Sequence, residues 1–176
     1  MAGSSSLINP FDIIVHDIET NGLRHELDRI HCASAICMLT GEVAAFRPHE
    51  ISEYVRLCRS AKVFVGHNII NFDNPVIDDL WTLRWTPDQC WDTLVVSRVF
   101  FPDRPQGHSL KSWGEKLGVI KGTYGETTDW SEFTEDMLEY NIQDNRVAKV
   151  LAEHQMKHAG VSLEELLEMG QWLKLG

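Results

Sequence analysis

Two acidic residues stand two positions apart near the end of an apolar segment. The run from Phe11 to Thr20 is rich in β-branched residues and is followed by Asn-Gly, which predicts a β-strand closed by a turn. Alternate side chains of a strand lie on one face, so we expect Asp17 and Glu19 to lie together. Two close carboxylates in a partly buried place are costly unless a cation neutralises them. Taken by itself, the pair is more simply a solvent-facing strand end.

A third acid, Asp73, stands at the boundary between a predicted strand and a predicted helix. The short apolar run at residues 63–65 predicts the strand, and Pro75 favours a first helical turn directly after Asp73. A strand that ends before a helix forms a natural crevice, from which this acid can point toward Asp17. An ordinary helix N-cap is the simpler interpretation of Asp73 alone.

Tyr140 and Asp144 stand four positions apart in the longest helical pattern of the chain, at residues 134–158. Residues at this spacing share one face of a helix. The apolar side of the helix is expected to pack on the sheet, so these two side chains would lie at one edge of the buried stripe. A buried, hydrogen-bonded Tyr/Asp pair is the simpler interpretation when it is taken alone.

The remaining patterns predict the elements that must position these residues. Apolar runs bounded by turn residues predict strands, and apolar residues at helical spacing predict helices. The expected strands cover residues 11–20, 30–38, 41–46, 63–65 and 90–91, and the expected helices cover residues 52–60, 74–83, 94–99, 108–117, 134–158 and 162–173. Three sequential antiparallel strands, followed by alternating helices and strands, indicate an α/β domain around one central mixed sheet.

Length, charge and composition restrict the function classes. The chain has 176 residues, 43% of them hydrophobic, which fits one compact domain over residues 1–176 and excludes a disordered chain. Its apolar stretches are too short to span a bilayer and its first residues do not resemble a secretion signal, so we expect a cytoplasmic protein with no membrane partner. The net charge of −10 argues against non-specific nucleic-acid binding, but not against a nuclease whose bound cations carry the substrate-binding charge.

Two smaller features of the composition allow more than one interpretation. The four cysteines, at positions 32, 37, 58 and 90, lack the spacing of a metal site, and we expect buried reduced thiols. Basic residues outnumber acidic ones over residues 98–121. That stretch is either an ordinary solvated surface or a DNA-contacting one.

Taken together, the acidic motifs resemble a known family in type, order and spacing. Asp17-Ile-Glu, Asn68-Ile-Ile-Asn-Phe-Asp and Tyr140-Asn-Ile-Gln-Asp are similar to the three motifs of the DEDD superfamily of 3′-to-5′ exonucleases, in the branch with a tyrosine in the third motif. Asp92-Thr-Leu-Val-Val-Ser-Arg and His108-Ser-Leu-Lys-Ser-Trp-Gly resemble segments of the proofreading exonuclease domains of podophage family A DNA polymerases. The resemblance covers residues 11–155 and implies an RNase H-like fold with a mixed five-stranded sheet.

The resemblance also implies a metal-dependent mechanism. Two Mg²⁺ ions, for which Mn²⁺ can substitute, would activate a water and stabilise the leaving oxygen of a phosphodiester. Asp17 would bridge both ions, Glu19 and Asp144 would complete the site of the attacking water, and Asp73 would serve the second ion. Tyr140 would orient the water, since its ordinary pKa near 10 makes the phenol a poor base.

Four residues are expected to contact the substrate. Thr20 and Leu23 would hold the terminal nucleotide, and Phe72 would stack on a base. Core packing is the alternative for Leu23 and Phe72. Asn68 is expected to fix the turn before Asp73 or to contact the strand.

The expected activity is removal of nucleotides from a single-stranded or frayed 3′ DNA end, as nucleoside 5′-monophosphates, together with a DNA polymerase partner. If the protein is phage-encoded, it would act in the host cytoplasm. The alternatives are an exoribonuclease of the same fold and an accessory polymerase subunit that does not cleave. The tryptophans at 81, 85, 130 and 172 are expected mostly in the core, with some exposed for contact with a polymerase.

Overall fold

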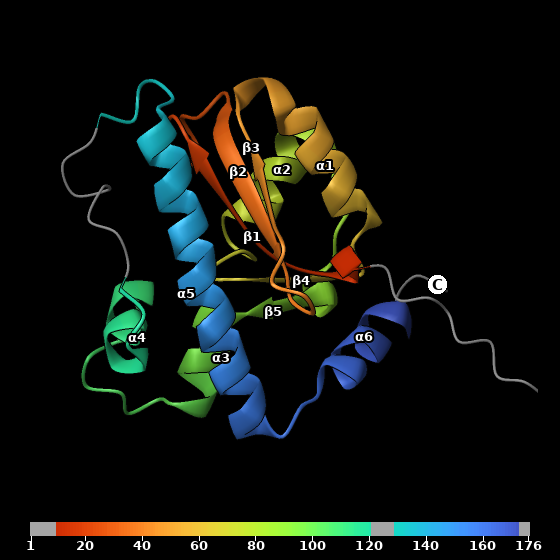
Figure 1. Cartoon of the computed structure of the whole chain (residues 1–176), viewed down its shortest axis with the longest axis vertical. Helices are drawn as coiled ribbons and strands as arrows, with labels where there is room; N and C mark the ends of the chain where they lie inside the picture. The colour runs from red at the N-terminus through yellow and green to blue at the C-terminus, as the bar shows by residue number, and fades with distance from the viewer. Residues whose placement is uncertain (1–9, 121–128, 173–176) are drawn as a thin grey trace, which may run out of the picture.

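Five strands form one mixed sheet at the centre of the molecule, in the order β3-β2-β1-β4-β5 (Figure 1). The computed structural model describes residues 10–120 and 129–172, except for the side chains of 169–172. β1, β2 and β3 pair in antiparallel fashion, whereas β4 and β5 run parallel to β1. The predicted mixed five-stranded sheet is therefore confirmed. The strands are β1 (Ile13–Thr20), β2 (Ile30–Cys37), β3 (Val43–Phe46), β4 (Val63–Gly66) and β5 (Cys90–Asp92).

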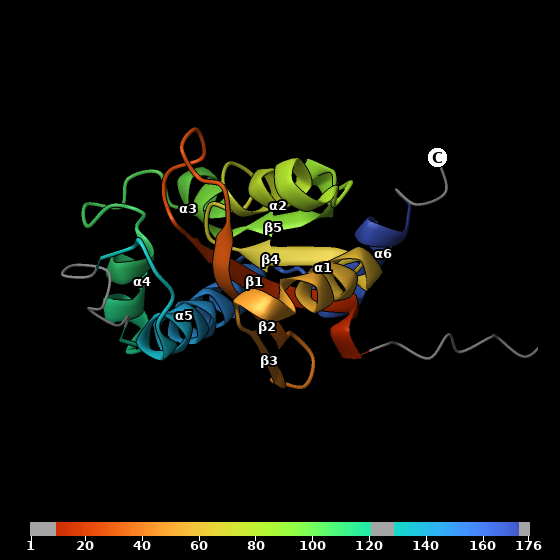
Figure 2. The same ribbon diagram turned by 90° about the horizontal axis from the view of Figure 1, so that it is seen from above.

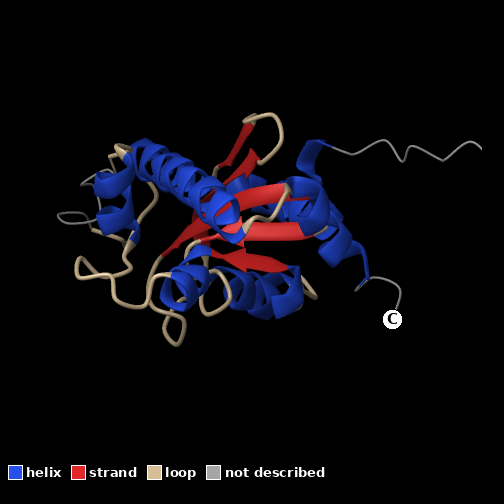
Figure 3. Ribbon diagram, turned by 90° about the horizontal axis from the view of Figure 1, so that it is seen from below, coloured by secondary structure: helices blue, strands red, loops and turns tan. Residues whose placement is uncertain are grey.

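Helices flank this sheet. Helix α5 crosses one face, and α1 and α2 cover the other (Figure 2). Seen from the opposite side, the same sheet lies enclosed between helices (Figure 3). The α-helices are α1 (Ile51–Ser60), α2 (Asp73–Trp81), α3 (Thr93–Phe100), α4 (Leu110–Leu117), α5 (Glu135–Ala159) and α6 (Leu163–Trp172), and the 3-10 helices are η1 (Pro10–Asp12), η2 (Pro48–Glu50) and η3 (Pro87–Gln89).

The alternation of side chains along β1 decides which helix each residue faces. Ile13 and Val15 belong to the apolar cluster that contains Val147 of α5. Ile14 and Ile18 belong to a second cluster, formed with α1 and α2. Because side chains of a strand alternate between its faces, the odd-numbered residues of β1 face α5.

Two helix boundaries differ from the sequence-based ones for local reasons. Helix α2 ends at Trp81 and not at residue 83, because Thr82 adopts the left-handed conformation with φ of 58°. Helix α4 begins at Leu110, because the Ser109 hydroxyl caps its first turn. The predicted loop after α4 falls mainly on residues 121–128, and the predicted end of the last helix on 173; both lie outside the described residues.

The four cysteines are free thiols, as predicted. Cys32, Cys37 and Cys58 are buried, and Cys90 is half-buried. None of the helices in the described part of the chain has the length and apolar character that crossing a bilayer would need.

Candidate active site

Asp17 and Glu19 continue the side of β1 that faces α5. Both are half-buried, and Val15, before them on the same side, is completely buried against that helix. The two carboxylates therefore stand where the apolar stripe of the strand ends.

A buried polar ladder ties Asp17 to helix α5. The Asn141 side-chain amide donates a hydrogen bond of 2.7 Å to Asp17 Oδ2. Ser34 pairs directly with Asp17 across the β1–β2 register, and its hydroxyl donates to Asn141 Oδ1 at 2.6 Å. One turn along the helix, Asn145 Nδ2 donates to the Ser34 carbonyl and hydroxyl at 3.0 and 2.8 Å. Asp17 is thus fixed at the point where strand and helix meet.

On α5, Tyr140 directly precedes Asn141, and Asp144 follows Asn141 by three positions. Asp144 is buried, three residues beyond Asn141 and three before the buried Val147, so it lies on the sheet-facing side of the helix. Tyr140 is half-buried, and its ring lies edge-on to Trp130 with centroids 6.3 Å apart. The helix therefore brings Asp144 to the neighbourhood of Asp17 and leaves Tyr140 at the border of the buried region.

Asp73, the first residue of helix α2, also contacts strand β1. Its carboxylate accepts a hydrogen bond of 3.0 Å from the backbone N–H of Ile18, between the two acids of β1. Phe72 holds the N-cap position of α2, so Asp73 is the first helical residue and not the cap. Burial raises the pKa of Asp73 to about 7, the Ile18 N–H opposes this rise, and the nearby charge of Asp92 adds to it.

A pocket of about 320 Å³ opens beside Glu19. It brings together three of the four predicted substrate residues, Thr20, Leu23 and Phe72. Leu23 is 73% exposed, so the core-packing alternative is wrong for it, whereas Phe72 both lines the pocket and packs on the apolar cluster beneath α2. The remaining lining residues are Ile18, Gly22 and Trp130.

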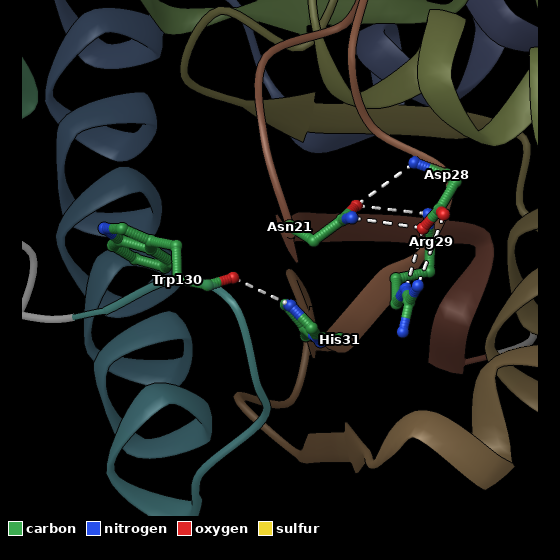
Figure 4. Close-up of polar contacts among 5 residues, drawn as sticks. All are labelled: Asn21, Asp28, Arg29, His31 and Trp130. Atoms are coloured by element: carbon green, nitrogen blue, oxygen red, sulfur yellow. Dashed lines mark hydrogen bonds and ion pairs between the residues drawn. The ribbon is translucent and has the colours of Figure 1, made fainter.

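The pocket walls are fastened to the fold by polar contacts (Figure 4). The Asn21 side-chain oxygen accepts from the backbone N–H groups of Asp28 and Arg29 at 3.1 and 3.3 Å, which closes the loop between β1 and β2. His31 Nε2 donates to the Trp130 carbonyl at 3.0 Å. Sequence reasoning did not place Trp130 in the site, because only tertiary contact brings it to β1.

Asn68 fixes the turn before Asp73 and is not part of the pocket lining. It has a positive φ of 71°, and its backbone N–H donates to Asp92 Oδ1 at 3.0 Å. Asp92 Oδ2 accepts from Ile70 N–H at 3.0 Å, while Oδ1 also caps α3. Asp92 is a buried acid near the site that sequence reasoning missed as a site residue; its position directly before a helix was the available signal.

The donor set has the chemistry of a site for a hard divalent cation. It consists of carboxylate oxygens, which Mg²⁺ prefers as ligands: Asp17, Glu19, Asp73 and Asp144. Over residues 10–120 and 129–172, no three His, Cys, Asp or Glu side chains are gathered into a ready-made metal cage. Neighbouring carboxylates repel one another, and a bound cation removes this repulsion.

Comparison with known proteins relates the chain to polymerases and nucleases. No family model matches it. It is 29% identical to the DNA-directed DNA polymerase of Escherichia phage T7 over 183 aligned residues, covering 80% of this chain and 26% of the polymerase. The corresponding enzyme of Enterobacteria phage T3 is 28% identical over the same shares. The chain thus spans about a quarter of the length of these curated relatives.

Solved structures with a similar fold include several nucleases. Brucella melitensis NrnC with bound Mg²⁺ matches with a TM-score of 0.62 and 21% identity, covering 94% of this chain and 86% of that one. The family B DNA polymerase of Pyrobaculum calidifontis matches with a TM-score of 0.64 and 17% identity, over 90% of this chain and 26% of that one. Escherichia coli exonuclease I in complex with a dT13 oligonucleotide matches with a TM-score of 0.57 and 16% identity, over 84% and 42%. The predicted RNase H-like exonuclease fold is confirmed.

Proposed function

We propose that this chain, which belongs to the DEDD superfamily of 3′-to-5′ exonucleases, shortens DNA from its 3′ end and releases nucleoside 5′-monophosphates. The observation that carries the proposal is the attachment of two carboxylates to one strand segment: Asp17 is tied to α5, and Asp73 is tied to the backbone of Ile18. Asp144 and Glu19 face the same region. A pocket large enough for a nucleotide's base and sugar opens beside them.

Divalent cations are the proposed cofactors, because NrnC, of similar fold, has a structure with bound Mg²⁺ and the donor set here consists of carboxylates. We propose two Mg²⁺ ions, replaceable by Mn²⁺, which Asp17 would help to hold. Glu19 and Asp144 would bind one ion, and Asp73 the other. When bound, the ions would supply an activated water and stabilise the charge that develops on the leaving oxygen.

The protein's own residues position the reacting groups. Asn141 holds Asp17 in one orientation, and the Ser34 hydroxyl in turn holds the Asn141 amide. Tyr140, packed against Trp130, is the proposed hydrogen-bonding partner of the attacking water. Orientation of that water is the role that we assign to the Tyr140 phenol.

The pocket beside Glu19 is the proposed site of the terminal nucleotide. Phe72 presents an aromatic ring on which a base can stack, a contact that contributes about 1–3 kcal/mol. Exposed Leu23 would insert against the base or the sugar, and Thr20 would offer its backbone. A terminal nucleotide in this pocket would place the phosphodiester on its 5′ side, which joins it to the penultimate nucleotide, next to the acids of β1.

The activity on whole substrates and the protein's partners are also proposals. We propose that residues 1–176 form one exonuclease domain that works with a DNA polymerase, since the similar phage proteins are DNA polymerases. Preferential removal of mismatched primer ends would follow, because a frayed 3′ end reaches the pocket more easily than a paired one.

The test is a cleavage assay on a 5′-labelled DNA primer, matched or mismatched at its 3′ end, with an RNA oligonucleotide of the same sequence in parallel. We expect a Mg²⁺-dependent ladder that shortens from the 3′ end, faster on the mismatch and suppressed by EDTA. Faster shortening of the RNA would favour the exoribonuclease alternative. No shortening of any substrate in Mg²⁺ or Mn²⁺ would favour the accessory subunit that does not cleave.

A further inference from the structure

A second pocket, of about 330 Å³, lies at the loop between α3 and α4 and is built differently from the first. Aromatic rings form its walls, among them Phe101 and the completely buried Trp113. Two cationic groups lie against Trp113: the guanidinium carbon of Arg104 is 3.8 Å from the ring centroid, and the ammonium of Lys116 is 5.2 Å from it. Both distances are within the range of cation–π attraction.

Arg104 is held rigidly in this pocket. Its Nε donates to the Gly107 carbonyl at 2.7 Å, and its Nη2 donates to the carbonyl and hydroxyl of Ser112 at 2.7 and 2.8 Å. Nη1 makes no hydrogen bond within the described residues. These contacts already order the guanidinium. The Arg104 side chain would therefore lose little further conformational entropy when an anion binds to it.

Helix α5 adds Lys157 and two histidines to the same place. The ring of His154 stacks on Phe101 with centroids 6.0 Å apart, and His158 lies 4.6 Å from Phe101. Burial lowers the pKa of His154, and the charges of Lys116, His158, Lys157 and Arg104 lower it further. We call Arg104, Lys116, Lys157 and the two histidines the cationic cluster; its positive charge comes from the arginine and the two lysines.

The cationic cluster is not neutralised by the acids around it. Among the described residues, no salt bridge joins Arg104, Lys116 or Lys157 to a carboxylate, and Asp103 is the one acid that lines the pocket. A local concentration of positive charge in a chain of net charge −10 attracts anions to this one place.

The cationic cluster lies on the same side of α5 as Tyr140. Tyr140 and His158 are 18 residues apart, which is five full helical turns, so the two side chains leave the helix in the same direction. The ten residues from Asp144 to His154 correspond to a rise of about 15 Å. Figure 1 shows α3 and α4 beside the C-terminal half of this helix.

We propose that the cationic cluster binds the phosphodiester backbone of the DNA strand a few nucleotides from the 3′ end that is hydrolysed. This inference rests on the proposed function. The rise of about 15 Å equals roughly four phosphates at the 3.4 Å spacing of one strand of a duplex. Aromatic rings together with arginine and lysine are the groups that track a nucleic-acid backbone without reading its sequence.

Binding is measured first, in EDTA, so that the outcome does not depend on cleavage. The probe is a fluorescent single-stranded DNA of about 12 nucleotides, titrated at several salt concentrations. The variant is K116Q/K157Q, because both residues are exposed and glutamine removes the charge while keeping most of the side chain. The control is Arg56→Gln, which removes an exposed charge on α1. We expect the double variant to weaken binding about tenfold and to reduce the salt slope by about 1.4, and the control to change neither.

Kinetics then separate this inference from the proposed function. If the wild-type protein cleaves, the ratio of kcat/KM on the 12-nucleotide substrate to kcat/KM on a dinucleotide should fall about tenfold in K116Q/K157Q. If the wild-type protein cleaves nothing, the proposed function fails and the binding titration alone decides. Wild-type affinity and salt slope in the double variant would overturn the inference. The inference would also be overturned if the wild-type protein bound a polyglutamate peptide but not DNA, and if the double variant lost that binding.

Discussion

Asn141 Nδ2 lies 2.7 Å from Asp17 Oδ2, so one hydrogen bond joins the central strand and the longest helix at the candidate active site. Asn141 is completely buried, and its side-chain oxygen is occupied by the Ser34 hydroxyl. The amide therefore has one orientation available, and it fixes the direction in which Asp17 presents its other oxygen. Outer residues of this kind set the affinity of a site for its cation.

Replacement of Asn141 by alanine should weaken the site without removing a ligand. We expect a 10- to 100-fold loss of activity that higher Mg²⁺ partly restores, because Asp17 is then free to rotate. The measurement is the Mg²⁺ concentration at half-maximal activity. Asn145→Ala is the matched control: it breaks the ladder at Ser34 without touching Asp17, and should lower stability while leaving the Mg²⁺ requirement unchanged. An equal shift in both variants would contradict a specific role for Asn141.

Replacement of Asp17 by alanine should abolish cleavage and leave the fold intact. The carboxylate is half-buried and lies at the end of the apolar stripe, so its removal eliminates a proposed ligand but little packing. Activity is followed on the labelled primer and folding by circular dichroism. Hydrolysis that survives in a folded Asp17→Ala protein would eliminate the two-metal assignment.

Tyr140→Phe should be milder than Asp17→Ala. The variant keeps the ring that packs edge-on against Trp130 and removes only the hydroxyl that is proposed to orient the water. We expect a fall in kcat of at most about a hundredfold, with KM nearly unchanged. A loss as large as that of Asp17→Ala would assign Tyr140 a more direct role in the chemistry.

Phe72→Ala should raise KM more than it lowers kcat. A lost base-stacking contact of about 1–3 kcal/mol corresponds to an increase of roughly 5- to 150-fold. Phe46→Ala serves as the control, because Phe46 packs on the same apolar cluster and does not line the pocket. Comparable KM increases in the two variants would indicate that Phe72 acts through packing alone.

Folding stability should decrease as the pH falls below 6.5. Burial lowers the pKa of His16 to about 3, although the nearby Asn74 side chain opposes this effect. Between these two values the unfolded chain binds a proton that the folded chain does not, so acid favours unfolding. This histidine alone should lower the free energy of unfolding by about 2 kcal/mol between pH 6.5 and pH 5.

The measurement is denaturant unfolding in EDTA from pH 7.5 to pH 5, on the wild-type protein and on His16→Gln. The variant is expected to be less stable throughout, since Tyr54 loses a hydrogen-bonding partner. The comparison is therefore between the two slopes with pH. Parallel slopes would show that His16 does not carry the effect.

Local patterns were sufficient to predict most of the fold. The five proposed catalytic residues were predicted only from the resemblance of the combined motifs to a family, because each motif alone allows a simpler interpretation. The strand at Asp17 and Glu19 follows from apolar alternation, and the turn residues near it mark its end. Tyr140 and Asp144 follow from helical spacing. Each of these inferences uses residues that are neighbours in the chain, where sequence distance and spatial distance agree.

The parts that sequence reasoning missed depend on tertiary contact. Asn141 and Asn145 are completely buried on helix α5, where both contact Ser34. In the sequence alone, two asparagines four positions apart on a helix indicate a solvent-facing side. Trp130 reaches the pocket from more than a hundred residues beyond β1. Asp92 joins a turn and a helix that sequence distance alone does not bring together.

Asp92 makes helix α3 a spacer of fixed length between two parts of the molecule. The carboxylate fastens the start of the helix to the turn that carries Asp73, and the far end of the helix leads into the loop of Arg104. Eight residues at 1.5 Å each make a rigid spacer of about 12 Å between the two. Insertion of one residue would rotate its far end by about 100°, so the length of α3 sets the orientation of the cationic cluster relative to the candidate active site.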